Sequence, residues 1–285
     1  MSVQTGFIKG RDQTQIYYNL QGIGNPLVFS YGVTCGVYHF KYQFKYFKDQ
    51  YQILQYDYRG HHNSEMPQKF ENLNIEECAY DLKAILDTLK IEKATLVGHS
   101  MGVAVNLKFY DLFPERVKAL VLVCGGIRNP FDIMFYTDLT KVFFEATKWG
   151  YLNYPEPLTK IWKNIPLSLT HQVISLLGYN KLLSDKNDIM QYVEGMKSHP
   201  IETLLYFLQD YSKFNGKNIC EKTICPTLII GGQADLITPI AHVRKIHSFI
   251  KGSELFIVPH GSHVSQVDMP EVVNLRIEKF LNSLS

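Results

Sequence analysis

A short glycine-flanked segment around Ser100 has the residue types of a nucleophilic turn. Residues 98–102 read Gly-His-Ser-Met-Gly, which fits the pattern Gly-x-Ser-x-Gly. The apolar run 94–97 precedes it, and residues 103–110 have the composition of a helix that ends before Pro114. A strand, a sharp turn and a helix in this order hold a serine hydroxyl above the end of a sheet, where a substrate can reach it. The pattern therefore predicts that Ser100 is a nucleophile.

A serine of this kind needs a base, and the base needs an acid that orients it. Both partners are expected just beyond the carboxyl ends of parallel strands, because substrates of open sheets lie at that edge. Asp235 follows the apolar run 227–231, and His263 follows the run 254–258. The order Ser, Asp, His along the chain is the order that the serine turn predicts. Asp235 and His263 are therefore the predicted acid and base.

Segments typical of strands and of helices alternate along most of the chain. Almost wholly apolar runs predict buried strands, and the segments between them have the spacing of amphipathic helices. The predicted strands are 27–30, 52–56, 94–97, 117–124, 227–231 and 254–258, after an opening hairpin of 6–9 and 15–19; the predicted helices include 38–49, 74–89, 103–110, 239–249 and 270–284. This alternation is typical of a parallel sheet with helices on both faces.

The alternation is interrupted between residues 128 and 222. The interruption is rich in aromatic and aliphatic residues, is punctuated by prolines and is helical in parts. We interpret it as a helical cap inserted into one α/β unit, so that residues 1–127 and 223–285 form the two parts of the core. The aromatic stretch 131–162 is expected to fold over Ser100 as the wall of an apolar pocket. The alternative is that this stretch forms a patch facing a membrane surface, because it also contains lysines.

With these features the chain resembles the α/β-hydrolase superfamily over residues 6–284. The elbow at 98–102, the segment 232–239 with its Gly-x-x-Asp-x-x-Thr-Pro-like pattern, and a late histidine followed by Asp268-Met269-Pro270 carry the resemblance, and Asp57-Tyr58-Arg59-Gly60 looks like a loop of the same family. The resemblance implies a mostly parallel sheet flanked by helices with an inserted helical cap. It also implies Ser100 as nucleophile, His263 as general base and Asp235 as its orienter.

Rivals for these roles exist. Asp132 and Asp138 are alternatives for the acid, although neither directly follows its strand. His260 is an alternative for the base, but the family places its histidine seven residues before the proline, which favours His263 over His260.

An acyl-transfer reaction also needs donors for the oxygen anion of its intermediate. The backbone N–H of Met101 is one expected donor, because it starts the helix after the nucleophile. The resemblance points to Val33 as the second. Many relatives have His-Gly before that position, whereas this chain has Tyr31-Gly32. His62 is a second departure, since glycine is common at that position. The sequence therefore does not show which residues support the loop that contains Val33.

Composition argues for a globular protein without a nucleic-acid partner. The 29 basic and 27 acidic side chains form no basic stripe. No apolar run approaches the ~20 residues of a membrane span, so no stable membrane insertion is expected. Five scattered cysteines form no Cys-x-x-Cys pair, and the start of the chain lacks the pattern of a signal peptide, so a cytoplasmic location is expected.

A pair of histidines and one cysteine could also carry chemistry. His61 and His62 are adjacent, so their side chains point apart, and no third ligand lies nearby; no metal site and no cofactor are predicted. Cys35 lies beside the expected oxyanion loop. Its side chain could be a reactive thiol, but a small buried residue that fills space in the core is the favoured interpretation.

The predicted activity is hydrolysis of a carboxylic ester or related acyl bond of a small apolar substrate. Dehalogenases and epoxide hydrolases of this fold use Asp at the elbow, whereas position 100 is Ser. Carbon–carbon bond hydrolysis, lactone opening and cofactor-free perhydrolysis on the same residues are the alternatives, followed by a receptor that kept the fold.

Overall fold

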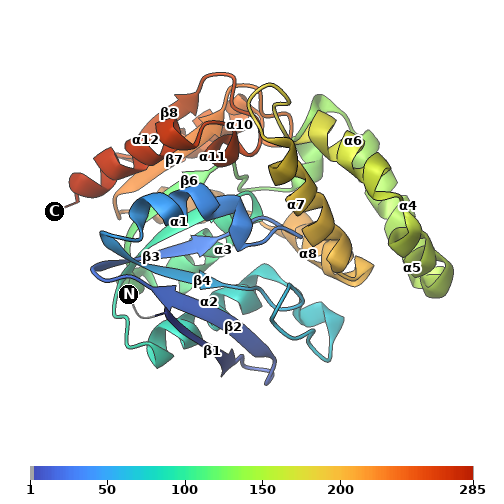
Figure 1. The fold of residues 1–285 in the computed structure, drawn as a ribbon, viewed down its shortest axis with the longest axis horizontal. Helices are drawn as coiled ribbons and strands as arrows, with labels where there is room; N and C mark the ends of the chain where they lie inside the picture. The colour runs from blue at the N-terminus through green and yellow to red at the C-terminus, as the bar shows by residue number, and fades with distance from the viewer. Residues whose placement is uncertain (1–2, 285) are drawn as a thin grey trace.

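An eight-stranded sheet forms the centre of the computed structural model, which describes residues 3–284 (Figure 1). The strands are β1 (Val3–Lys9), β2 (Gln15–Gln21), β3 (Asn25–Ser30), β4 (Tyr51–Tyr56), β5 (Ala94–His99), β6 (Val117–Val123), β7 (Thr227–Gly232) and β8 (Glu254–Val258). Their order across the sheet is β1-β2-β4-β3-β5-β6-β7-β8. β2 pairs antiparallel with β1 and with β4, and every other pair is parallel. The predicted mostly parallel sheet is therefore confirmed.

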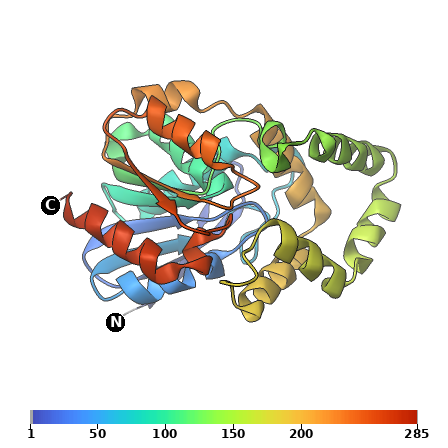
Figure 2. The ribbon, with the colours of Figure 1, turned by 90° about the horizontal axis from the view of Figure 1, so that it is seen from above.

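Helices cover both faces of the sheet, as Figure 2 shows from above. On one side, α1 (Lys41–Phe47), α11 (Ser265–Asp268) and α12 (Pro270–Asn282) pack together; on the other lie α2 (Ile75–Thr88), α3 (Met101–Leu112), α9 (Lys217–Lys222) and α10 (Ile240–Phe249). The predicted helix 38–49 consists of a 3₁₀ turn, Val37–Phe40, followed by α1. β5 and β6 are buried along nearly their whole length, as their apolar runs require.

The chain between β6 and β7 contains helices and, within the described residues, no strand. After 3₁₀ turns at Pro130–Asp132 and Met134–Tyr136 come α4 (Leu139–Asn153), α5 (Pro155–Asn164), α6 (Leu167–Leu177), α7 (Lys186–Ser198) and α8 (Ile201–Lys213). α4 and α5 lie farthest from the sheet in Figure 1. None of the helices in residues 3–284 has both the length and the apolar content that a membrane crossing requires.

The aromatic stretch 131–162 divides between the interior and the solvent. Phe131 and Phe144 stack with ring centroids 4.5 Å apart and pack against α8 in a small apolar cluster. Phe143 and Trp149 are exposed, at 76% and 62% of their surface. The division of the chain at 128 and 222 stays a prediction.

A buried ion pair ties the N-terminal strands to the helical layer. Arg59 is fully buried, and its guanidinium donates two hydrogen bonds to Asp81 of α2, at 2.8 and 2.7 Å. It also donates to the Asp12 carboxylate and to the Asn72 carbonyl. Because every partner is in place, the charge of Arg59 is compensated inside the protein. The Asp57–Gly60 loop is thereby fixed beside the opening of α2.

Removing the carboxylate of Asp81 should leave the Arg59 charge without its main partner. We expect Asp81→Asn to lower the free energy of unfolding by about 3–5 kcal/mol, the usual cost of breaking a buried pair on one side. Urea denaturation followed by circular dichroism measures this. Asp111→Asn is the matched control, because it removes the carboxylate of an exposed ion pair on α3, in which Asp111 Oδ2 lies 3.7 Å from Lys108 Nζ. Equal losses in the two variants would contradict the prediction.

Candidate active site

The turn between β5 and α3 places Ser100 in a strained backbone conformation. Its φ of 55° and ψ of −121° lie where L-residues are rarely found. A Cβ at Gly98 would come within 2.6 Å of the Gly102 carbonyl oxygen, and a Cβ at Gly102 would overlap the Ser30 carbonyl. Both glycines are therefore required by close backbone approach, which explains the Gly-x-Ser-x-Gly pattern.

His263 joins Ser100 to Asp235 through one chain of hydrogen bonds. Its Nε2 lies 2.9 Å from Ser100 Oγ, and its Nδ1 lies 3.0 Å from Asp235 Oδ2. The backbone N–H groups of Ile237 and Thr238 both donate to Asp235 Oδ1 at 2.8 Å, which holds the carboxylate in place. With Nδ1–H donating to Asp235, the lone pair of Nε2 faces the serine hydroxyl. The side chain of Asp235 and that of His263 are both buried.

The rival residues lie elsewhere. His260 is exposed, and its backbone N–H donates to Gln233. Asp132 is exposed and accepts a hydrogen bond from Asn129, and Asp138 is exposed at the start of α4. Among the described carboxylates, the one hydrogen-bonded to His263 is Asp235.

The expected oxyanion donors flank the serine. Met101 begins α3, and Val33 lies in the loop that follows β3. Neither backbone N–H donates to another residue within 3–284. A Cβ at Gly32 would lie 3.3 Å from Ser100 Oγ, so this loop passes directly beside the nucleophile. Both N–H groups are therefore free to face a bound oxygen.

The loop after β3 is held by a second loop, residues 57–62, that sequence reasoning did not connect with it. The Tyr31 hydroxyl donates to Asp57 at 3.3 Å and accepts from the Tyr58 N–H at 3.0 Å. The Tyr58 hydroxyl in turn donates to the Tyr31 carbonyl at 3.0 Å. Tyr31 thus supplies support where many relatives have histidine.

The two adjacent histidines of that second loop complete the brace. The Thr34 N–H donates to His61 Nε2 at 3.0 Å, and His62 Nε2 donates to the Cys35 carbonyl at 2.8 Å. Burial lowers the pKa of His61 well below its ordinary value, and this keeps its Nε2 free to accept. Both rings therefore position the loop beside Ser100.

Asp268 fixes the loop that carries His263. Its Oδ2 accepts from the backbone N–H of Ser262, the residue before His263, at 2.6 Å. Its Oδ1 accepts from the Ser184 hydroxyl of the 128–222 segment. Asp268 therefore links the position of His263 to the helical insertion.

A cavity of about 210 Å³ opens at Ser100 and His263. It is lined by Val33, Cys35, His39, His99, Ser100, Met134, Phe135, Ile174, Leu177, Gly178, Tyr179, Tyr192, Ile237, His263 and Val264. Seven of these, from Met134 to Tyr192, belong to the 128–222 segment. Most lining side chains are apolar. Burial raises the pKa of the Cys35 thiol far above its usual range, which disfavours the reactive thiolate.

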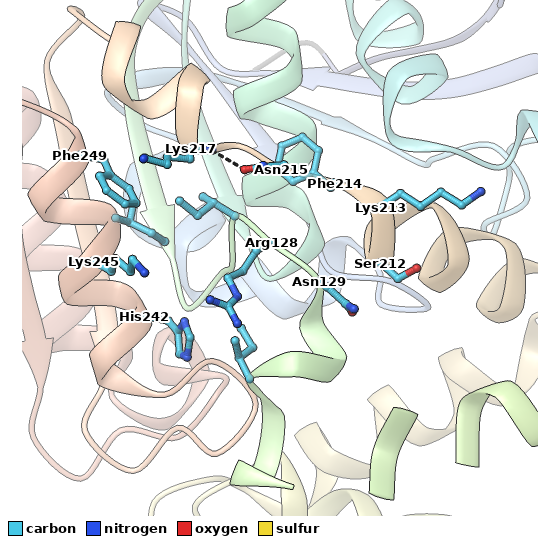
Figure 3. A pocket seen from close by; sticks show the side chains of 13 residues that line it. Arg128, Asn129, Ser212, Lys213, Phe214, Asn215, Lys217, His242, Lys245 and Phe249 are labelled. Carbon is cyan, nitrogen blue, oxygen red and sulfur yellow. Dashed lines mark hydrogen bonds between the residues drawn. The ribbon is translucent and has the colours of Figure 1, made fainter. Parts of the chain in front are cut away.

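A larger cavity of about 580 Å³ lies between α10 and the end of α8, and contains none of the predicted site residues. Figure 3 shows Arg128 extending toward His242, with Lys217 and Lys245 on the surrounding helices. Because Ser100, Asp235 and His263 do not line this cavity, size alone does not identify the candidate site.

Comparisons with known proteins agree with this architecture. The model of the alpha/beta hydrolase fold family matches residues 25–270. Over 264 residues the chain is 27% identical to epoxide hydrolase 1 of Caenorhabditis elegans. The aligned region covers 90% of this chain and 64% of that protein. The chain thus spans less than two thirds of that relative.

Solved structures with the same fold are less similar in sequence. A thermophilic esterase from Thermogutta terrifontis superposes with a TM-score of 0.82 at 19% identity, covering 99% of each chain. The enol-lactonase from Burkholderia xenovorans LB400 gives a TM-score of 0.81 at 16% identity, covering 97% of this chain and all of that one. At these identities the likeness concerns the fold.

The role of the Tyr31 hydroxyl can be measured through stability. Tyr31→Phe removes the acceptor of the buried Tyr58 N–H, so we expect the free energy of unfolding to fall by about 1–3 kcal/mol. Chemical denaturation provides the value. In Tyr46→Phe the lost hydroxyl donates to Glu278 at the surface, and the change should stay within about 0.5 kcal/mol. Comparable losses would show that Tyr31 does not brace the loop.

Proposed function

Because the chain belongs to the alpha/beta hydrolase family, we propose that it is a serine hydrolase that cleaves a carboxylic ester or related acyl bond of a small apolar substrate. The observation that carries the proposal is the hydrogen-bond chain from Ser100 through His263 to Asp235, open to an apolar cavity. We assign Ser100 as nucleophile, His263 as general base and Asp235 as the group that orients it.

The proposed reaction has two halves. Ser100 Oγ attacks the acyl carbon while His263 Nε2 takes its proton, and the N–H groups of Val33 and Met101 stabilise the resulting oxyanion. The intermediate collapses, the proton passes from His263 to the departing alcohol, and the acyl group stays on Ser100. Water, deprotonated by His263, then attacks the acyl-enzyme and releases the acid.

The nucleophile decides between the activities named for the relatives. The Caenorhabditis elegans relative is called an epoxide hydrolase. If Ser100 opened an epoxide ring, the product would be an ether on the enzyme, which water does not readily cleave. Attack on an acyl carbon gives an ester, which water releases. A serine at position 100 therefore favours acyl substrates.

The cavity supports a small substrate. Sites for drug-sized ligands occupy about 300–1,000 Å³, above the 210 Å³ found beside Ser100. Met134, Phe135 and Ile174 contribute apolar wall from the 128–222 segment, so we propose that this segment acts as a cap that selects the acyl group.

Loss of the nucleophile should nearly abolish turnover. We expect Ser100→Ala to reduce kcat for an activated ester such as 4-nitrophenyl acetate by about 10⁶, because residues of such a triad act as one unit. Purified variants are compared in a spectrophotometric assay. His260→Asn should keep wild-type turnover, since His260 is exposed on the same loop and contacts no reacting group. Undiminished hydrolysis by Ser100→Ala would refute the proposal.

The same purified protein distinguishes the alternative reactions. A matched ester, lactone, thioester and β-diketone carrying one acyl group are offered at equal concentration. The proposal expects the highest kcat/KM for the ester. A preference for the β-diketone would instead assign carbon–carbon bond hydrolysis to the same three residues.

The size of the pocket should set the acyl-chain preference. Phe135→Ala enlarges the wall of the cavity, so the ratio of kcat/KM for hexanoate over acetate esters should rise by about tenfold or more. Phe143→Ala is the control, because Phe143 is 76% exposed on α4 and does not line the cavity. Equal ratios in wild type and both variants would place the acyl group elsewhere.

A further inference from the structure

Three side chains that could bind a metal ion converge beside the proposed nucleophile. Cys35, His39 and His99 each offer one donor atom, and the three atoms lie within 4.8 Å of one another. All three residues are at least nine-tenths buried and line the cavity that holds Ser100. No carboxylate belongs to this group. One thiol with two imidazoles is a donor set that suits Zn²⁺ better than harder ions such as Mg²⁺.

Each imidazole of the group has one nitrogen that is free. His99 Nε2 donates to the His263 carbonyl at 2.9 Å, so His99 Nδ1 carries a lone pair. His39 Nε2 is paired with the Tyr179 hydroxyl at 2.9 Å. The Nδ1 atoms of both rings are buried and have no hydrogen-bond partner among the described residues. Such unpaired buried atoms are rare, and a ligand would satisfy both.

Both imidazoles also have an outer partner that would orient them. The His263 carbonyl holds the His99 ring, and the Tyr179 hydroxyl holds the His39 ring. Metal-binding histidines in proteins show this arrangement, with the second nitrogen fixed by a carbonyl or another oxygen.

We propose that Cys35, His39 and His99 form a zinc site that opens into the cavity beside Ser100. Ligand atoms of tetrahedral zinc lie about 3.3–3.8 Å apart, given Zn–N near 2.0 Å and Zn–S near 2.3 Å. Since the three donor atoms lie within 4.8 Å of one another, binding requires them to approach by at most about 1.5 Å. The Cys35 thiol loses its proton to solvent as the Zn–S bond forms, and the fourth position faces the cavity.

Bound zinc would inhibit the proposed hydrolysis. This consequence rests on the proposed function, whereas the metal site itself is independent of it. The ring of His99 lies 5.0 Å from that of His263, centroid to centroid. A cation there opposes the positive charge that His263 gains when it accepts the serine proton. Zinc at one ion per chain should therefore lower turnover at least tenfold, and a chelator should restore it.

Binding is tested without activity. Chelator-treated full-length protein is titrated with Co²⁺ as a spectroscopic substitute for zinc, and a sulfur-to-cobalt charge-transfer band is expected at one ion per chain. Ser100→Ala should keep the band, so the metal site is tested even where no hydrolysis occurs. Cys35→Ser should abolish it. Cys225→Ser is the matched control, a free cysteine outside the cavity, and should keep it.

Zinc itself provides the second measurement. Calorimetry in buffers of different ionisation enthalpy should report about one proton released per zinc, because the Cys35 thiol must ionise to bind the metal. Tyr179→Phe should weaken zinc binding about 10–100-fold, the usual effect of losing an outer partner of a ligating histidine, and serves if Cys35→Ser fails to fold. A wild-type cobalt spectrum without the charge-transfer band, or a band that survives Cys35→Ser, overturns the proposal.

Discussion

The close approach of α3 to the end of β3 is the constraint on which the site depends. Gly102 lies so near the Ser30 carbonyl that any side chain there would overlap it. This contact forces the first turn of α3 against the loop that begins at Tyr31. Gly32 and Ser100, the neighbours of the expected oxyanion donors Val33 and Met101, come together for the same reason. The strained backbone of Ser100 is the local cost of that arrangement.

The loop beside Ser100 depends in turn on residues far from any substrate. Tyr31 is hydrogen-bonded to Asp57 and Tyr58. The loop that contains these two residues continues into Arg59, whose charge is neutralised by Asp81. Burial of Arg59 therefore fixes the backbone from which His61 and its neighbours hold the loop beside Ser100. Stability of the core and geometry of the site are connected through this single segment.

Residues that follow strands directly could be predicted from the sequence, because a parallel sheet brings its carboxyl ends to one edge. Ser100, Asp235 and His263 each belong to this group, and the structure brings them into one hydrogen-bond chain. The contact of Tyr31 with Tyr58 could not be predicted, because it depends on the packing of two irregular loops. The same holds for the convergence of Cys35 and His99, which no short motif connects.

The helical insertion was the least predictable part, because its helices carry apolar residues on more than one face. Phe143 and Phe144 are neighbours in sequence, yet one is exposed and the other buried. Periodicity alone cannot assign such a helix to one packing partner.

The helical segment between β6 and β7 is attached to the rest of the protein at the loop that carries His263. Ser184 and Ser262 are both bonded to Asp268, and the Ser262 hydroxyl also donates to the Gly178 carbonyl at 3.0 Å. Asp188 of α7 accepts from Lys41 and Tyr42 on α1, beside the same loop. Movement of α6 and α7 would therefore displace the backbone next to His263. The segment that lines the cavity and the loop that carries His263 are held by shared hydrogen bonds, so a change in the shape of the cavity and a change in the position of His263 are linked.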